Sequence, residues 1–324
     1  MTDRFISRRR LLAAAPLLLR PGVQPARAAT DKLRGIFPIV QTPYTASGAV
    51  DFAALEQEVR FLDRCGVHGI VWPQRASQYQ YLSFSERIEG VERIAAANQG
   101  RKPALVIGVQ ASDTATAVRY ARHAATLRPD AIIALPTKDR GEFNLDEVAK
   151  YFAAIAKACD LPLFIQTTGN MSVEFMTKLE REMPILQFVK DEAGDPVRRL
   201  SEFRARGSRL RVFTGNHGRT LIEEMIRGVA GNMPASAWAD LYVQVWDHWH
   251  AGRHNQALDA FSKAQLFIAQ ATQYGFPAIH YVLRLRGVFP NADIRGSDFP
   301  PLDDDARKSL RATYEFVKPH LTVR

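Results

Sequence analysis

The chain has 324 residues, of which 46% are hydrophobic and 24% are charged, a composition typical of a globular protein with a sizeable buried core. Its formal net charge of +9 is concentrated at one end, because residues 1–28 contain six arginines and one aspartate. The rest of the chain carries only a small positive excess. The composition therefore does not indicate a nucleic-acid-binding protein.

The first 28 residues have the pattern of an export signal. Ser7-Arg8-Arg9-Arg10 precedes an apolar run from Leu11 to Leu19, and Ala26-Arg27-Ala28 supplies the small residues of a cleavage site. This order resembles a twin-arginine signal, although a basic N-terminal tail is the alternative. The apolar run is too short for a permanent membrane anchor. We expect cleavage near Ala28 and a periplasmic mature protein.

From Gly35 onward, short apolar runs alternate with amphipathic segments, which is the signature of repeated βα units. Eight runs are predicted to be strands, namely Ile36–Val40, Gly69–Trp72, Ala104–Gly108, Ala131–Leu135, Leu163–Gln166, Leu186–Lys190, Leu210–Thr214 and Gly228–Asn232. The segments between them are predicted to be helices, namely Phe52–Cys65, Phe84–Asn98, Thr114–Thr126, Leu145–Cys159, Val173–Met183, Val197–Arg206 and Gly218–Arg227. Asp113 and Asn144 stand at N-cap positions. Eight such units favour a closed (β/α)8 TIM barrel over an open doubly wound sheet.

The pattern changes after the eighth predicted strand. Four further helices are predicted without strands between them, at Ala237–His250, Gln256–Tyr274, Pro277–Gly287 and Asp304–Lys318. The first of these closes the barrel in our interpretation, and the others form a small C-terminal helical region. The predicted organisation is therefore a signal peptide at 1–28, a barrel at 29–250 and the helical region at 251–324.

Lys190 is the first candidate for chemistry. It ends the apolar run Leu186–Val189 and is followed at once by Asp191 and Glu192. A lysine at the carboxyl end of a barrel strand lies where barrel enzymes bind ligands, and its amine is able to form a Schiff base with a carbonyl. The structural alternative is a surface lysine paired with one of the two acids.

Further polar residues follow other predicted strands and are expected at the same mouth. They are Arg75, Ser77 and Gln78 after strand two, Lys138 after strand four, Gln166 and Thr167 at strand five, and Gly215, Asn216 and His217 after strand seven. Two lysines, an arginine and a histidine around one mouth would make a positive pocket. Such a pocket suits an anionic substrate, such as an oxo acid.

A series of short motifs runs from Gly35 to the C-terminal helices. They are Gly35-Ile36-Phe37-Pro38, Thr42-Pro43-Tyr44, Gly48, Asp51, Gly66-Val67-His68-Gly69-Ile70, Leu82, Ser85-Glu86-Arg87, Leu161-Pro162, Val189-Lys190, Ala193-Gly194-Asp195 and Gly215-Asn216. In order and spacing they resemble the dihydrodipicolinate synthase and N-acetylneuraminate lyase family. The resemblance implies a barrel with C-terminal helices, a homotetramer or homodimer, and a Schiff base between Lys190 and pyruvate or another 2-oxo acid. It implies no cofactor.

The chain departs from this family at two places. Gln74-Arg75-Ala76-Ser77-Gln78 replaces the loop that holds the oxo-acid carboxylate in the family, so Arg75 or Ser77 is expected to bind that carboxylate instead. Gln166 replaces the strand-five tyrosine that relays protons, and a glutamine positions a substrate without titrating. Ordinary lysine-biosynthetic activity is therefore not expected.

Two functions remain open on the sequence. The first is a lyase that uses the imine for aldol cleavage or condensation, or for dehydration, of a 2-oxo acid or sugar-acid-like substrate. Lys138, His217, the Asp191–Glu192 pair or a bound water would then transfer protons. The second is a weak or inactive relative that binds an anionic small molecule in the periplasm. His248, His250 and His254 lack a nearby carboxylate or cysteine at ligand spacing, so no metal site is predicted.

Overall fold

The eight apolar runs pair in parallel around a ring. The computed structural model describes residues 32–138, 141–296 and 299–323, and its sheet has the order β1-β8-β7-β6-β5-β4-β3-β2. The strands are β1 (Gly35–Ile36), β2 (Gly69–Trp72), β3 (Ala104–Gly108), β4 (Ala131–Ala134), β5 (Leu163–Gln166), β6 (Leu186–Asp191), β7 (Arg211–Thr214) and β8 (Gly231–Asn232). A parallel bridge between Ile39 and Val71 completes the ring between the first strand segment and β2. The predicted (β/α)8 barrel is confirmed.

Strand β1 is shorter than the sequence predicts. The predicted run continued to Val40, but β1 ends at Ile36 and only the bridge at Ile39 follows. Pro38 has no backbone N–H to donate, so it interrupts a continuous ladder at this point.

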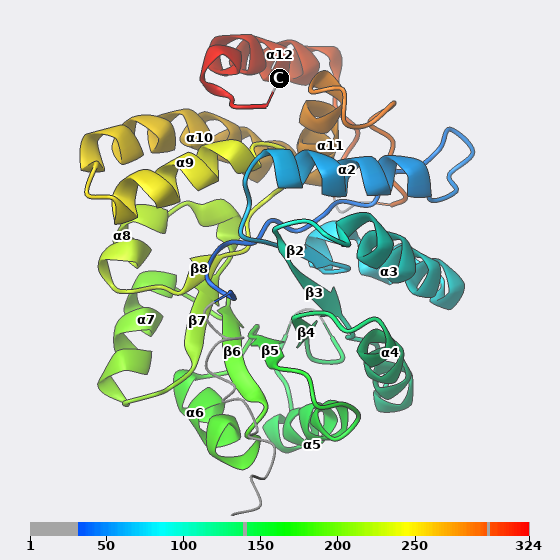
Figure 1. Ribbon diagram of the computed structural model, residues 1–324, viewed down its shortest axis with the longest axis vertical. Coiled ribbons are helices and arrows are strands. Elements are labelled where there is room, and N and C mark those ends of the chain that lie inside the picture. Colours follow the sequence, from blue (N-terminus) through cyan, green and yellow to red (C-terminus); the bar gives the residue numbers. More distant parts are fainter. Residues whose placement is uncertain (1–31, 139–140, 297–298, 324) are drawn as a thin grey trace, which may run out of the picture.

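Seven helices alternate with the strands and surround them (Figure 1). They are α2 (Phe52–Arg64), α3 (Phe84–Asn98), α4 (Thr114–Thr126), α5 (Leu145–Ala156), α6 (Val173–Glu182), α7 (Pro196–Ala205) and α8 (Leu221–Ile226). Both predicted caps are confirmed. Asp113 Oδ1 accepts the N–H of Thr116 at 2.8 Å, and Asn144 Oδ1 accepts the N–H of Asp146 at 3.1 Å. Each cap satisfies a helix donor that has no intrahelical partner.

The C-terminal helices gather on one side of the barrel, as Figure 1 shows. They are α9 (Ala239–His250), α10 (His254–Tyr274), α11 (Phe276–Leu285) and α12 (Asp304–Val317). Short 3₁₀ turns occur in the described residues at η1 (Arg75–Ser77), η2 (Tyr79–Tyr81), η3 (Asn216–Gly218) and η4 (Lys318–His320). A fully buried ion pair joins Arg286, just after α11, to Asp240 of α9 with two contacts of 2.9 Å. None of the helices in the described ranges combines the length and apolar composition needed to cross a bilayer.

Four phenylalanines fill the barrel interior beneath its carboxyl end. The rings of Phe164 and Phe188 stack with centroids 4.3 Å apart, and Phe213 meets Phe164 and Phe37 edge to face at 5.2 and 5.1 Å. Side chains alternate along a strand, so Lys190, two residues after Phe188, also points inward. The aromatic layer therefore forms a floor directly below the lysine.

Candidate active site

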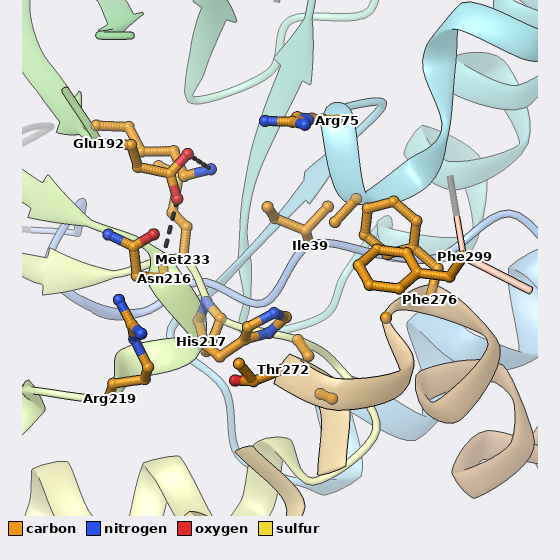
Figure 2. A pocket seen from close by; sticks show the side chains of 16 residues that line it. Ile39, Arg75, Glu192, Asn216, His217, Arg219, Met233, Thr272, Phe276 and Phe299 are labelled. Atoms are coloured by element: carbon orange, nitrogen blue, oxygen red, sulfur yellow. Dashed lines mark hydrogen bonds and ion pairs between the residues drawn. The ribbon is translucent and has the colours of Figure 1, made fainter. Parts of the chain in front are cut away.

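A cavity of about 330 Å³ opens at the carboxyl ends of the strands and contains the Lys190 amine. Charged and polar side chains from the strand-end loops line one part of it, namely Arg75, Lys190, Glu192, Asn216, His217 and Arg219. Phe276 and Phe299, from the C-terminal helical region, line another part (Figure 2). The cavity is at the small end of the range for ligand pockets, which suits a small organic acid.

Lys190 is held by a short polar network. Strands β5 and β6 pair in a register that places Gln166 beside Lys190. The Lys190 Nζ lies 3.2 Å from Gln166 Oε1 and 3.1 Å from Glu192 Oε2, and its side chain is only 3% exposed. These contacts use two of the three donor positions of an ammonium group. The amine is thus oriented at the cavity wall with one position still open.

Glu192 is positioned from three directions. Its Oε2 also accepts the Nε2–H of Gln166 at 2.5 Å, and its Oε1 accepts the backbone N–H of Asn216 at 3.1 Å. Asn216 lies in the left-handed region at φ 50°, which short polar side chains tolerate. A Cβ at Gly215 beside it would lie 1.7 Å from Glu192 Oε1, so a larger residue there would displace the carboxylate. The carboxylate therefore fills the space that a side chain at 215 would need.

Asp191 has a different environment from its neighbour. It points to the other face of β6, where both of its oxygens contact the Arg199 guanidinium at 2.7 Å. Thr167 donates its hydroxyl to Asp191 Oδ1 at 2.7 Å and accepts the N–H of Glu192 at 3.0 Å. Asp191 and Thr167 thus fix the end of β6, and of the two adjacent acids only Glu192 faces the amine.

His217 lines the cavity next to Asn216. Its own burial lowers the pKa of the imidazole, and the nearby Glu192 carboxylate only partly offsets this effect. The ring is therefore neutral at pH 7. Its backbone is fixed by the hydroxyl of Tyr242, which donates to the His217 carbonyl at 2.5 Å.

Four of the ten predicted residues line the cavity, and six do not. Arg75, Lys190, Asn216 and His217 line it, whereas Gln166 and Gly215 act through the Lys190–Glu192 pair. Ser77 donates its hydroxyl to the Val40 carbonyl at 2.6 Å, and Gln78 donates its amide to the Gly296 carbonyl at 2.6 Å. These two side chains support the loop and are not among the lining residues.

Lys138 is a correction to the predicted pocket. It is exposed and lines a separate cavity beside α5, together with Asp113 and Glu147. The loop after β4 carries it away from the ring of strand ends. The expected pair of lysines at one mouth is therefore not formed, because Lys138 is not among the residues that line the Lys190 cavity.

Several lining residues are not singled out by the sequence, and three of them, Arg219, Phe276 and Phe299, shape the chemistry of the cavity. Arg219 lies two residues after the predicted Gly215–His217 segment, in the loop that follows β7, so its place in the sequence is enough to suggest it as a site residue. Phe276 and Phe299 come from a region predicted only as a helical appendage, and no local pattern connects them with the barrel mouth. Among the described residues, no three His, Cys, Asp or Glu side chains form a group able to hold a metal ion.

Comparison with known proteins agrees with this arrangement of strands. An L-2-keto-3-deoxyarabonate dehydratase of Azospirillum brasilense is 25% identical over 304 residues, which span 90% of this chain and 97% of the relative. A 4-hydroxy-tetrahydrodipicolinate synthase of Rhizobium meliloti is 28% identical over 237 residues, which span 71% and 80%. The solved structure of Proteus mirabilis N-acetylneuraminate lyase shares the fold, with a TM-score of 0.78 at 20% identity over 88% of this chain and 98% of that one.

The chain also matches the model of a whole family. Residues 32–316 match the profile described as the dihydrodipicolinate synthetase family. The predicted resemblance is thereby confirmed, and so is the prediction of an enzyme of the lyase class. With nearly all of its described residues inside the match, the chain belongs to the dihydrodipicolinate synthetase family.

Proposed function

We propose that this protein is a Schiff-base lyase that dehydrates a 2-oxo acid, with Lys190 as the nucleophile and Glu192 as the proton-transfer group. The observation that carries the proposal is the 3.1 Å contact between Lys190 Nζ and Glu192 Oε2 at the wall of the strand-end cavity. A nucleophilic amine needs an adjacent base, and the carboxylate is within hydrogen-bond reach of it.

Imine formation follows from this contact. Glu192 accepts a proton from the Lys190 ammonium, and the free amine adds to the substrate carbonyl at C2. The carbinolamine then loses water, with its hydroxyl protonated by Glu192, and a protonated imine remains. Gln166 holds both partners during these steps, since its Oε1 accepts from Lys190 and its Nε2 donates to Glu192.

The imine is an electron sink for the elimination. Glu192 removes a proton from C3, which gives an enamine, and returns that proton to the hydroxyl group at C4, which the enamine expels as water. Hydrolysis of the resulting imine consumes the water released when it formed and frees Lys190. The net reaction converts the acid into its unsaturated product plus one water.

Dehydration is favoured over aldol chemistry by where the base lies. Glu192 is beside the imine nitrogen, and C3 is only two bonds from that nitrogen, so the carboxylate lies near the proton that dehydration removes. Aldol cleavage breaks the C3–C4 bond and removes no proton from C3. The dehydratase named among the relatives, which the chain matches over nearly its whole length, supports the same choice.

Hydrogen exchange into pyruvate tests the proposal without knowledge of the natural substrate. In D2O the enzyme should exchange the methyl protons of pyruvate, measured by proton NMR, because exchange requires both the imine and a base at C3. Lys190→Met should abolish exchange. Glu192→Gln should still form the imine but exchange about 10²- to 10⁴-fold more slowly. Binding of pyruvate without exchange in the unsubstituted protein would favour the alternative of a binding protein.

The remaining predictions rest on the sequence. Residues 1–28 lie outside the described residues, so we propose periplasmic export from their sequence pattern alone. Replacement of Arg8 and Arg9 by lysine should leave the precursor in the cytoplasm, measured by cell fractionation, and unchanged export would contradict this assignment. A homodimer or homotetramer, implied by the family resemblance, remains a proposal for measurement by light scattering.

A further inference from the structure

Two arginines face the cavity in addition to the Lys190–Glu192 pair. Arg75 comes from the η1 turn after β2, and Arg219 follows the η3 turn after β7. Figure 2 shows them on opposite sides of the pocket. Within residues 32–138, 141–296 and 299–323, no carboxylate forms an ion pair with either guanidinium. Both therefore remain available to an anion in the cavity.

The charges around the cavity are unbalanced. Lys190, Arg75 and Arg219 are cationic, and Glu192 is the one acid among the lining residues. His217 adds no charge at pH 7, because burial lowers the pKa of its imidazole. The protonated imine keeps the positive charge of Lys190, so the site still carries an excess of two positive charges after the substrate carbonyl has reacted. One substrate carboxylate would neutralise only half of it.

The η3 turn links Arg219 to the catalytic pair. The backbone N–H of Asn216, at its start, binds Glu192 Oε1 at 3.1 Å, and the N–H of Arg219, at its end, donates to the Asn216 carbonyl at 3.3 Å. Gln265 of α10 donates to the Arg219 carbonyl at 2.9 Å. The backbone that carries Arg219 is thus fixed relative to the reacting carbons, whereas its exposed side chain is free to reach toward a substrate.

We infer that the substrate carries a second anionic group, bound by Arg219, in addition to the carboxylate next to its carbonyl, which Arg75 receives. This inference rests on the proposed function and adds the substrate class. A guanidinium binds carboxylate and phosphate with the same two-pronged geometry, so the shared chemistry is a distal anion. Phe276 and Phe299 form an apolar part of the cavity wall away from both arginines, so they need not contact an anionic group of the substrate.

The test compares acids that differ in the distal group. Borohydride trapping on Lys190 is titrated with 2-oxoglutarate against 2-oxopentanoate, and with 3-phosphohydroxypyruvate against hydroxypyruvate. In one of the two pairs, we expect the acid with the distal anionic group to reach half-saturation at an at least tenfold lower concentration. A hydrogen bond to a charged group contributes enough binding free energy for a change of this size. Which pair shows the preference identifies the distal group as carboxylate or phosphate.

Two variants make the result specific. Arg219→Gln should reduce the ratio of half-saturation concentrations within the preferred pair about tenfold or more. Arg209→Gln, the loss of an 84% exposed arginine that pairs with Glu180 at the other end of β7, should leave that ratio unchanged. Equal trapping of both acids in each pair, or a preference that survives Arg219→Gln, would overturn the inference while leaving the Schiff base intact.

Binding measured without borohydride separates this result from the proposed function. The rise in Tm caused by each acid reports binding even where no imine forms. A larger rise with the dianions that is lost in Arg219→Gln supports the inference, and equal rises within each pair overturn it. Absence of an adduct with every acid would instead count against Lys190 as the nucleophile.

Discussion

Two buried ion pairs in this protein differ in the number of contacts between their charged groups and in their exposure to solvent. Asp240 accepts two contacts from Arg286 at 2.9 Å and a further N–H from Thr322 at 2.9 Å, and both charged side chains are at most 1% exposed. Lys190 and Glu192 make a single 3.1 Å contact, and the Glu192 side chain is 20% exposed in the cavity. The first pair ties helices together, and the second leaves an amine proton and a carboxylate accessible to a ligand.

The difference shows why burial alone does not identify a catalytic charge. A buried pair is stable when each charge is compensated on all sides, and removal of one partner then leaves an uncompensated charge in the interior. The Lys190–Glu192 pair retains cavity access and neighbouring N–H donors, so it tolerates loss of a partner better. We therefore expect the two pairs to respond in opposite ways to substitution.

The largest effect on stability should come from Asp240→Ala. This change leaves the Arg286 guanidinium buried without its acid, and we expect the free energy of unfolding to fall by about 3–5 kcal/mol. Urea denaturation measures it. Asp304→Ala, which removes an exposed ion pair with Arg307, is the control and should leave the unfolding midpoint unchanged. A similar loss in both variants would show that burial of the Asp240–Arg286 pair does not decide the cost of losing one partner.

Lys190→Met should have the opposite profile. Exchange of the pyruvate methyl protons with D2O should be lost because no imine forms. The unfolding midpoint in urea should change much less than in Asp240→Ala. Glu192 remains partly exposed and keeps its bonds from Gln166 and Asn216 after the substitution. Unfolding of Lys190→Met to the extent seen for Asp240→Ala would show that the lysine is mainly structural.

Gly215→Ala should affect the open pair by a smaller amount. The new Cβ would meet Glu192 Oε1 at 1.7 Å and Lys190 Cε at 3.1 Å, and the carboxylate must move. We expect about a tenfold to hundredfold slower exchange. An unchanged exchange rate would show that the position of Glu192 is not critical.

Glu58 provides a third environment, an acid with no cationic partner among the described residues. It is fully buried, and the Gln41 N–H lies 3.1 Å from each of its carboxyl oxygens. Burial raises its pKa from the ordinary 4.5 to about 8. Between these two values the folded state holds a proton that the unfolded state has lost, so stability decreases as pH rises through this range.

Glu58→Gln should therefore flatten this pH dependence. Glutamine stays neutral and still accepts the Gln41 N–H, so the Tm of the variant relative to the unsubstituted protein should increase from pH 5 to pH 8. Scanning calorimetry across this range measures the difference. A difference that stays constant with pH would mean that the Glu58 carboxyl group is ionised in the folded protein.

Much of the fold follows from local patterns. The repeated alternation of apolar runs and amphipathic segments gave eight strands in the right places, and Asp113 and Asn144 cap the helices that they precede. Strand β1 was predicted too long, because apolar composition does not report the missing N–H of Pro38. These features depend on a few neighbouring residues, so the sequence contains the information needed to find them.

The site was less predictable because it depends on geometry between loops. Lys190 was found from its place at a strand end, but the choice between Asp191 and Glu192 depends on which face of β6 each side chain takes. Lys138 is predicted at the mouth because it follows the fourth strand. The prediction is wrong because residue types do not reveal the path of the loop that carries it. Phe276 and Phe299 reach the cavity only through the packing of the C-terminal helices against the barrel.

The most direct test of the central claim is borohydride trapping followed by peptide mass mapping. Mature protein is incubated with pyruvate, reduced, digested and compared with Glu192→Gln and Lys190→Met. We predict one reduced adduct, on the peptide containing Lys190, in the unsubstituted protein and in Glu192→Gln, and none in Lys190→Met. An adduct that maps to another lysine, or its absence with pyruvate and every other 2-oxo acid tried, would contradict it.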